Sequence, residues 1–174
     1  VMNGNYISLD NFPTRGLAIG DFENDGNAGL VTAEWAVANR YYKSNIGTFI
    51  AGTNVAAAAG NSNGVTAGDL DRDGNLDLVF GGETAADQVY YGDGAGNFAA
   101  GPTLDNSNGI TTALELGDVT GTGQQVIFAN GQARHLELRL NADNWLEPET
   151  ASLEFFTGGL TAPRLTTPRL EWAK

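Results

Sequence analysis

The chain has 174 residues, of which 41% are hydrophobic, so it fits one domain with a sizeable core. Its 21 Asp and Glu exceed its 9 Lys and Arg, and the net charge of -12 argues against nucleic acid and anionic membranes as partners. The absence of cysteine excludes disulfides and thiolate metal sites, and no apolar run is long enough for a membrane span.

An acidic motif recurs three times along the chain. Its copies are Gly-Asp-Phe-Glu-Asn-Asp-Gly-Asn at 20–27, Gly-Asp-Leu-Asp-Arg-Asp-Gly-Asn at 68–75 and Gly-Asp-Val-Thr-Gly-Thr-Gly-Gln at 117–124. A second motif keeps the same spacing, as Gly-Thr-Phe at 47–49, Gly-Asn-Phe at 96–98 and Asp-Asn-Trp at 143–145. Two motifs in step indicate a repeated structural unit of just under 50 residues.

The repeats divide the chain into segments whose strands follow one another in order. We expect the closing strands of one unit at 1–13, whole units at 16–54, 64–104 and 109–154, and the opening strands of another at 155–174. Within the clearest unit, short apolar or small-residue runs at 64–68, 78–81, 88–91 and 98–104 are separated by polar or Gly-rich turns. No stretch keeps a 3.6-residue apolar period over three turns, so the sequence predicts an all-β fold.

Four-stranded units of this length are typical of β-propeller blades. The sequence therefore predicts a single domain, 1–174, with three nearly complete blades and a fourth blade split between the termini. Such a split blade closes a four-blade ring within one chain, or it joins the chain to a second copy or a longer chain in a larger ring.

The second acidic loop, residues 69–77, has the pattern of a cation site. Acidic side chains stand at loop positions 1, 3, 5 and 9, Gly74 permits a sharp turn at position 6, and the position-7 carbonyl can also face inward. An all-oxygen, flexible set of ligands suits Ca²⁺ better than Mg²⁺ or Zn²⁺. The predicted ligands of this calcium ion are Asp69, Asp71, Asp73, Asn75 and Asp77.

The other two loops carry weaker forms of the pattern. The first loop, residues 21–29, has Gly29 where the second has Asp77, so it predicts a second, weaker calcium site, formed by Asp21, Glu23, Asp25 and Asn27. In the third loop, residues 118–125, Thr120 and Thr122 replace two carboxylates, which predicts a loop without metal. Calcium is then a local staple of one blade and not a condition for every blade to fold.

The run from Gly68 to Gly82, Gly-Asp-Leu-Asp-Arg-Asp-Gly-Asn-Leu-Asp-Leu-Val-Phe-Gly-Gly, resembles the FG-GAP/VCBS repeat, the blade of integrin-α-like propellers. The resemblance extends over about 16–154 and is clearest in the second unit. It implies a calcium-bearing propeller, usually of seven or eight blades, that is secreted or exposed at the cell surface and works in adhesion, carbohydrate recognition or as a module of secreted enzymes.

Residues outside the loops offer one candidate ligand contact and no catalytic constellation. Trp35 has no aromatic counterpart in the other units, which makes it the candidate for stacking on a sugar. The single histidine, His135, lies in an alternating strand pattern, and no nucleophile, phosphate-binding or zinc-protease motif is present, so no catalytic residue is assigned.

We therefore expect a non-catalytic, extracellular calcium-binding module for adhesion or recognition, with a glycan or an extracellular protein as its partner. Two alternatives remain open from the sequence. One is an accessory part of a secreted polysaccharide-active enzyme, and the other is a structural subunit whose complementary termini join copies into an assembly.

Overall fold

The computed structural model describes residues 12–45, 48–50, 52–59, 61–83, 85–104, 110–118, 123, 125–131 and 137–139. The described residues form strands and turns and no helix, which confirms the all-β prediction. The strands are β1 (Thr14–Gly20), β2 (Gly29–Glu34), β3 (Ala38–Tyr42), β4 (Ser44–Asn45), β5 (Thr48–Phe49), β6 (Thr53–Ala59), β7 (Ser62–Gly68), β8 (Asp77–Gly82), β9 (Asp87–Gly92), β10 (Phe98–Leu104), β11 (Thr111–Gly117), β12 (Val126–Gly131) and β13 (Glu137–Arg139).

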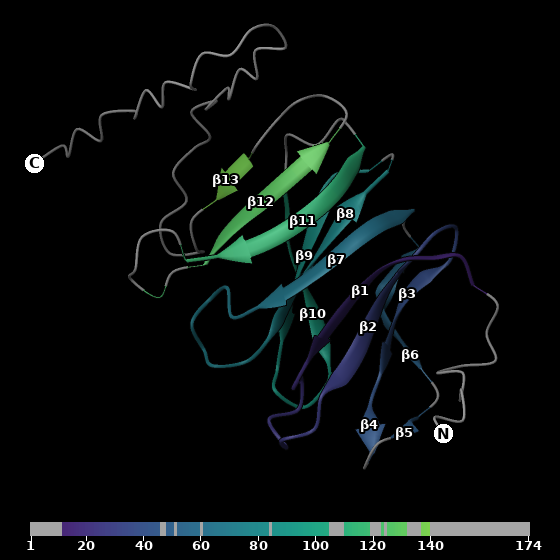
Figure 1. The fold of residues 1–174 in the computed structure, drawn as a ribbon, viewed down its shortest axis with the longest axis vertical. Helices are drawn as coiled ribbons and strands as arrows, with labels where there is room; N and C mark the ends of the chain where they lie inside the picture. The colour runs from purple at the N-terminus through teal and green to yellow at the C-terminus, as the bar shows by residue number, and fades with distance from the viewer. Residues whose placement is uncertain are drawn as a thin grey trace, which may run out of the picture.

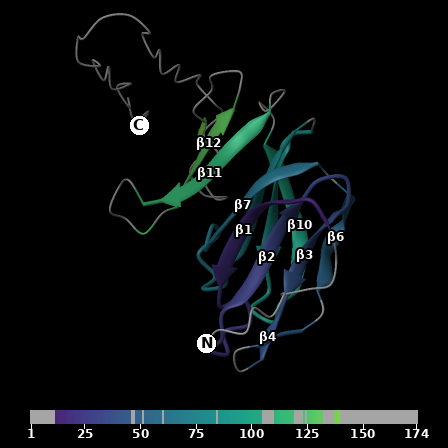
Figure 2. The same ribbon diagram turned by 45° about the vertical axis from the view of Figure 1, so that its right-hand side comes forward.

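The strands build three antiparallel sheets and one small hairpin (Figure 1). The first sheet has the order β1-β2-β3-β6, the second β7-β8-β9-β10 and the third β11-β12-β13, while β4 and β5 pair with each other. The first strand of the second sheet, β7, contacts both β1 and β11. In both views β7 runs between these two strands, so the three sheets follow one another side by side in chain order (Figures 1 and 2).

The opening hairpin of each sheet has the same register. The residue that closes the first strand pairs with the residue that opens the second, as in Gly20 with Gly29 and Gly68 with Asp77. Each hairpin also contains one register shift near the start of its first strand, between Thr14 and Gly16 in β1 and at the matching places in β7 and β11. The repeated motifs of the sequence therefore correspond to one repeated hairpin geometry.

Strand β8 of the second sheet is buried on both faces because this sheet lies between the other two. All residues of β8 are buried, and its side chains alternate between two apolar clusters. Leu78 and Phe80 pack with Val31 of the first sheet, whereas Val79 packs with Ile127 of the third. A continuous apolar run is the pattern expected of a strand that is covered on both sides.

Buried polar side chains also link neighbouring sheets in a repeated manner. Asn39 accepts a hydrogen bond from the backbone N–H of Glu34 at 2.9 Å and donates one to Ser62 of the second sheet at 2.9 Å. Asp87 makes the equivalent contacts, with the N–H of Gly82 and with the hydroxyl of Thr111 in the third sheet. Each partner satisfies a buried polar group, so these pairs fix how successive sheets align.

The strands of the clearest unit confirm the runs predicted at 64–68, 78–81, 88–91 and 98–104; the first three strands are two residues longer than predicted, and the fourth has the predicted bounds. The alanine-rich segment at 55–59 belongs to strand β6. The described residues show sheets side by side but no closed ring, so the propeller itself is taken up below as a proposal. The predicted strands at 1–11 and 155–174, the motif at 143–145 and His135 lie outside the described residues.

Candidate metal centre

The second loop connects β7 to β8 through a tight, partly left-handed turn. Arg72 and Gly74 have positive φ angles of 66° and 88°, and at the second of these positions glycine avoids the strain that a Cβ would bring. The backbone N–H of Gly74 donates to Oδ2 of Asp69 at 3.1 Å, which closes the turn. The first carboxylate of the loop is thereby held against the turn.

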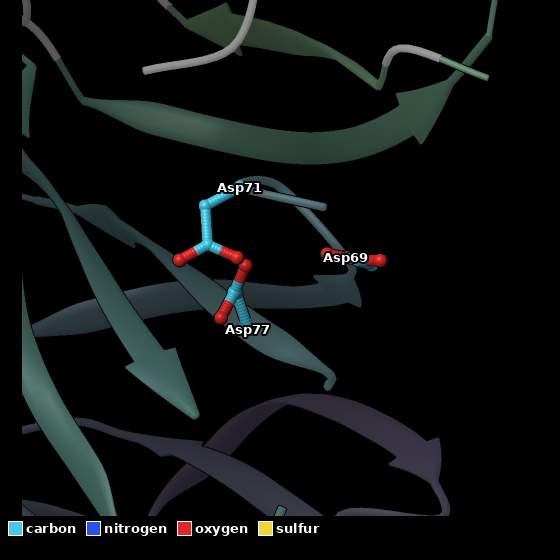
Figure 3. Close-up of side chains that lie close together, drawn as sticks. All are labelled: Asp69, Asp71 and Asp77. Atoms are coloured by element: carbon cyan, nitrogen blue, oxygen red, sulfur yellow. The ribbon is translucent and has the colours of Figure 1, made fainter. Parts of the chain in front are cut away.

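Three of the predicted ligands lie together. Carboxylate oxygens of Asp69, Asp71 and Asp77 all lie within 4.8 Å of one another, and these residues are called the acidic cluster below. Figure 3 shows the carboxylates of Asp71 and Asp77 pointing toward each other, with Asp69 beside them. Oxygens that bind one Ca²⁺ at about 2.4 Å can be separated by at most about 4.8 Å, so the spacing fits a single ion of this size.

Asp77 is the most deeply placed member of the acidic cluster, with no exposed surface. Its carboxylate accepts hydrogen bonds from the backbone N–H of Leu70 at 2.7 Å and from that of Gly92 at 2.9 Å. Burial nevertheless raises its pKa to about 6, and the neighbouring charge of Asp71 adds to the rise. The residue therefore ties the loop to the end of β9 while its negative charge remains poorly compensated.

Oδ1 of Asp69 is buried and has no hydrogen-bond partner among the described residues. The pKa of Asp71 is raised by burial and, in addition, by the charges of Asp73 and Asp69. A buried acceptor without a donor and mutually repelling carboxylates both cost free energy. A cation bound among these oxygens would remove both costs, so the donor set fits a hard divalent ion.

The other two predicted ligands face each other at the edge of the loop. Asp73 accepts hydrogen bonds from the backbone N–H of Asn75 at 2.8 Å and from its side-chain amide at 2.7 Å. The side-chain oxygen of Asn75 in turn accepts from the amide of Asn24 in the first loop at 2.8 Å. The structure thus gives Asp73 and Asn75 contacts within and between loops, and it does not bring Asp73 into the acidic cluster.

The first loop has a cation of its own. The ammonium of Lys43 lies 2.5 Å from Glu23 and 3.9 Å from Asp25, and a hydrogen bond to Glu23 raises its pKa. Asp21 receives the backbone N–H groups of Asp25 at 3.1 Å and Gly26 at 2.8 Å, and Asp25 receives that of Asn27 at 2.9 Å. The three acidic ligands predicted for the weaker site are therefore held by a lysine and by backbone donors, while the fourth, Asn27, donates to Asp25.

In the first loop an aromatic ring occupies the space beside the ninth position, which is Gly29. A Cβ on Gly29 would lie 2.7 Å from the ring of Tyr41, so the space that the Asp77 side chain takes in the second sheet is unavailable here. Burial raises the pKa of Tyr41 to about 12, and the nearby Glu23 adds to the rise. The ring also packs edge-on against Phe22 and Phe98, with centroids 5.6 Å away in each case.

In the third loop the first aspartate closes the turn, as its counterparts do in the other two loops. Oδ2 of Asp118 accepts the backbone N–H of Gly123 at 2.6 Å, as Asp69 accepts that of Gly74. Thr120 and Thr122 lie outside the described residues. The motif's first aspartate therefore closes the turn in all three loops, whether or not further carboxylates follow.

Trp35, the candidate ligand contact, lies at the end of the hairpin opposite the loops. Its side chain is 37% exposed, its indole N–H donates to Glu83 of the second sheet, and the guanidinium of Arg15 lies 5.0 Å from its ring centroid. Arg15 also contacts Glu83 at 3.2 Å. The tryptophan is thus held in a fixed orientation between two sheets, with one face partly covered by arginine.

Sequence reasoning missed two features of these sites. Lys43 stands outside the first loop, and only the pairing of β2 with β3 brings it near Glu23. The bond between Asp77 and Gly92 spans 15 residues and depends on the pairing of β8 with β9. The lysine directly after Tyr42, where the second sheet has Tyr91, was the available signal for the first feature.

No protein-family model matches the chain, and no curated protein is similar to it. Among the described residues there is no helix of the length and apolarity needed to cross a lipid bilayer. The sites must therefore be interpreted from their own chemistry.

Proposed function

We propose that this chain is a calcium-binding module of the propeller type, with Ca²⁺ held by the acidic cluster of the second loop. The observation that carries the proposal is the convergence of three carboxylates around a buried oxygen of Asp69 that has no hydrogen-bond partner among the described residues. Backbone carbonyls of the loop and water complete the coordination that Ca²⁺ prefers. When bound, the ion supplies positive charge that neutralises the loop.

Calcium is favoured over the other divalent ions by the ligand types. The cluster consists of carboxylates, without the imidazole or thiolate that zinc and copper prefer. Mg²⁺ demands a compact octahedron near 2.1 Å and retains most of its water, which suits a loop with fewer fixed carboxylates.

The propeller arrangement is supported by the way in which the sheets follow one another. Their first strands lie next to each other, each opening hairpin has the same register, and the same buried polar pairs link successive sheets. In a propeller the innermost strand of every blade lies beside those of its neighbours. We propose that the three sheets are consecutive blades of such a ring.

The proposed role is recognition or adhesion outside the cell, with a glycan or an extracellular protein as partner. Extracellular fluids contain enough free calcium for modules of modest affinity. Trp35 supports a recognition surface at the end away from the metal loops, because an exposed and oriented indole beside Arg15 and Glu83 offers stacking and hydrogen bonds together.

Two measurements test these parts separately. Calorimetric titration of Ca²⁺ into metal-stripped protein should show one site, with Mg²⁺ binding more weakly; no heat with Ca²⁺ would refute the metal site. Screening on a glycan array should give binding that Trp35→Ala abolishes, whereas Ile50→Ala, at another exposed apolar position, should bind as the wild type does. Equal loss in both variants would refute the assignment of Trp35.

A further inference from the structure

The turn between β9 and β10, residues 93–97, is seated in the first loop. The backbone N–H of Gly96 donates to the carbonyl oxygen of Phe22 at 3.1 Å. A Cβ on Gly96, whose φ is 80°, would lie 2.9 Å from the ring of Tyr41 and 3.0 Å from a carboxylate oxygen of Glu23. This turn of the second sheet therefore fits against the first loop only with glycine at this position.

The second loop joins the same contact through one pair of amides. The side-chain amide of Asn24 in the first loop donates to Oδ1 of Asn75 at 2.8 Å. A Cβ on Gly94, whose φ is 67°, would lie 2.6 Å from Nδ2 of Asn24 and closer still to Oδ1 of Asn75. Three turns from two sheets therefore meet where these two amides pair.

Asn24 is placed for this bond by its own backbone. Its φ of 52° lies in the left-handed region, which asparagine adopts more readily than most residues. Arg72 stands at the equivalent position of the second loop and has a φ of 66°, so the conformation belongs to the repeated turn. In the first loop this turn presents an amide donor to the neighbouring sheet.

Asn75 uses both ends of its side-chain amide. It donates to Asp73 at 2.7 Å while it accepts the bond from Asn24. Along the chain it stands between Asp69 and Asp77, the first and last members of the acidic cluster. The bond from Asn24 thus fixes the second loop at a point between its metal-binding ends.

We infer that Asn24 is a positioning residue for the calcium ion of the neighbouring loop, so that the metal affinity of the second sheet depends on a side chain of the first. The inference rests on the proposed calcium site. A loop that is held near its binding conformation before the ion arrives loses less conformational freedom on binding, so its affinity is higher. Because coupling between two sites is reciprocal, calcium should in turn strengthen the contact between the two loops.

Calorimetric titration of Ca²⁺ into metal-stripped variants of the full chain tests the inference. Asn24→Gly suits the left-handed backbone but removes the amide, so its dissociation constant should rise about two- to fivefold, the effect of one exposed hydrogen bond. Asn27→Ala is the matched control, because the amide of Asn27 bonds to Asp25 in its own loop. This control should bind Ca²⁺ as the wild type does.

Gly94→Ala tests the same contact without removing either amide. The added Cβ must displace the amide pair, so the calcium affinity should fall as it does in Asn24→Gly. Gly123→Ala in the third loop brings similar backbone strain, since its φ is 80°, but its Cβ meets nothing within 4 Å. It should lower the melting temperature and leave the dissociation constant unchanged. Circular dichroism should show that every variant is folded.

Hydrogen exchange supplies a readout that a merely structural bond would not move. Calcium should slow the exchange of backbone amides in residues 21–29 of the wild type, and this slowing should be lost in Asn24→Gly. Equal dissociation constants for the wild type, Asn24→Gly and Gly94→Ala would overturn the inference and leave the calcium site in place. Losses of the same size in Asn27→Ala or Gly123→Ala would also overturn it, because affinity would then follow general stability. A wild type that binds no calcium would refute the proposed site itself, and the inference with it.

Discussion

The ammonium of Lys43 lies 2.5 Å from a carboxylate oxygen of Glu23 in the first loop. Lys43 directly follows Tyr42, which pairs with Leu30, just as Tyr91 follows Tyr90, which pairs with Leu78. At the register position of Lys43 the first sheet therefore has a cation and the second an aromatic side chain. Together with Gly29, which stands where the second loop has Asp77, this difference explains why the first loop neutralises its own acids while the second fits a metal.

Replacing Lys43 should allow the first loop to bind a metal ion. Lys43→Met removes the partner of Glu23 and Asp25, so the melting temperature without metal should fall slightly, by an amount typical of an exposed ion pair. Part of the loss should return on addition of Ca²⁺, measured by thermal unfolding with and without chelator. A wild-type protein that binds two calcium ions equally well would contradict this account of the first loop.

Removing the first aspartate of the third loop should lower the stability of the protein without changing its stabilisation by calcium. Asp118→Ala deletes the acceptor of the Gly123 N–H, a loss of about 1 kcal/mol for a hydrogen bond of this kind. The shift in melting temperature caused by chelator should equal that of the wild type. If Asp118→Ala abolished the chelator effect, the assignment of the metal to the second loop would be wrong.

Two equivalent glycines should respond in opposite ways to the same substitution. A Cβ on Gly16 would lie 2.7 Å from the Cα of Gly64, so Gly16→Ala must push β1 and β7 apart, at a cost of about 1–3 kcal/mol. A Cβ on Gly64 meets nothing within 4 Å. Gly64→Ala should be neutral or stabilise by about 0.4–1 kcal/mol, because it restricts the unfolded chain. Chemical denaturation compares the two, and equal losses would contradict the packing of β1 on β7.

The metal-free protein should become less stable as the pH rises from about 4 to about 6. Burial raises the pKa of Asp77 to about 6 from an ordinary value of 3.8, so in this range the folded state holds a proton that the unfolded state has lost. Stability from this group is complete below the unfolded pKa and is lost through the folded pKa. With saturating Ca²⁺ the trend should reverse, since the ion requires the carboxylate. Melting temperatures measured across this pH range should fall with rising pH in chelator and rise with pH in calcium. The same pH dependence under both conditions would count against a metal at Asp77.

The parts of the fold that the sequence predicts are those set by local patterns. Val79 and Phe80 lie in a continuous apolar run between Gly-rich turns, and this run indicates a strand covered on both faces. The shared spacing of Asp21, Asp69 and Asp118 likewise predicts three equivalent turns. Both features depend on neighbours in the chain, so they can be recognised without knowledge of the tertiary contacts.

The parts that escape prediction depend on which strands pair. Alternating carboxylates at positions 1, 3, 5 and 9 suggest equal ligands, yet Asp73 turns to Asn75 while Asp77 is anchored by Gly92 of another strand. The exposure of Leu17 cannot be inferred from its apolar side chain, because it depends on the absence of a preceding sheet among the described residues. Spacing identifies the loop, and tertiary contacts decide the function of each side chain within it.

The most direct test of the metal centre compares two isosteric variants at the same loop position. Asp71→Asn removes one charge from the acidic cluster, and Glu23→Gln removes the equivalent charge from the lysine-paired first loop. In the wild type, calcium at a hundredfold excess over its dissociation constant adds about 2.7 kcal/mol, which is a rise of about 5–10 °C in melting temperature. The account predicts that Asp71→Asn loses most of this rise and Glu23→Gln keeps it. An unchanged rise in Asp71→Asn, or its loss in Glu23→Gln alone, would contradict the assignment of calcium to Asp69, Asp71 and Asp77.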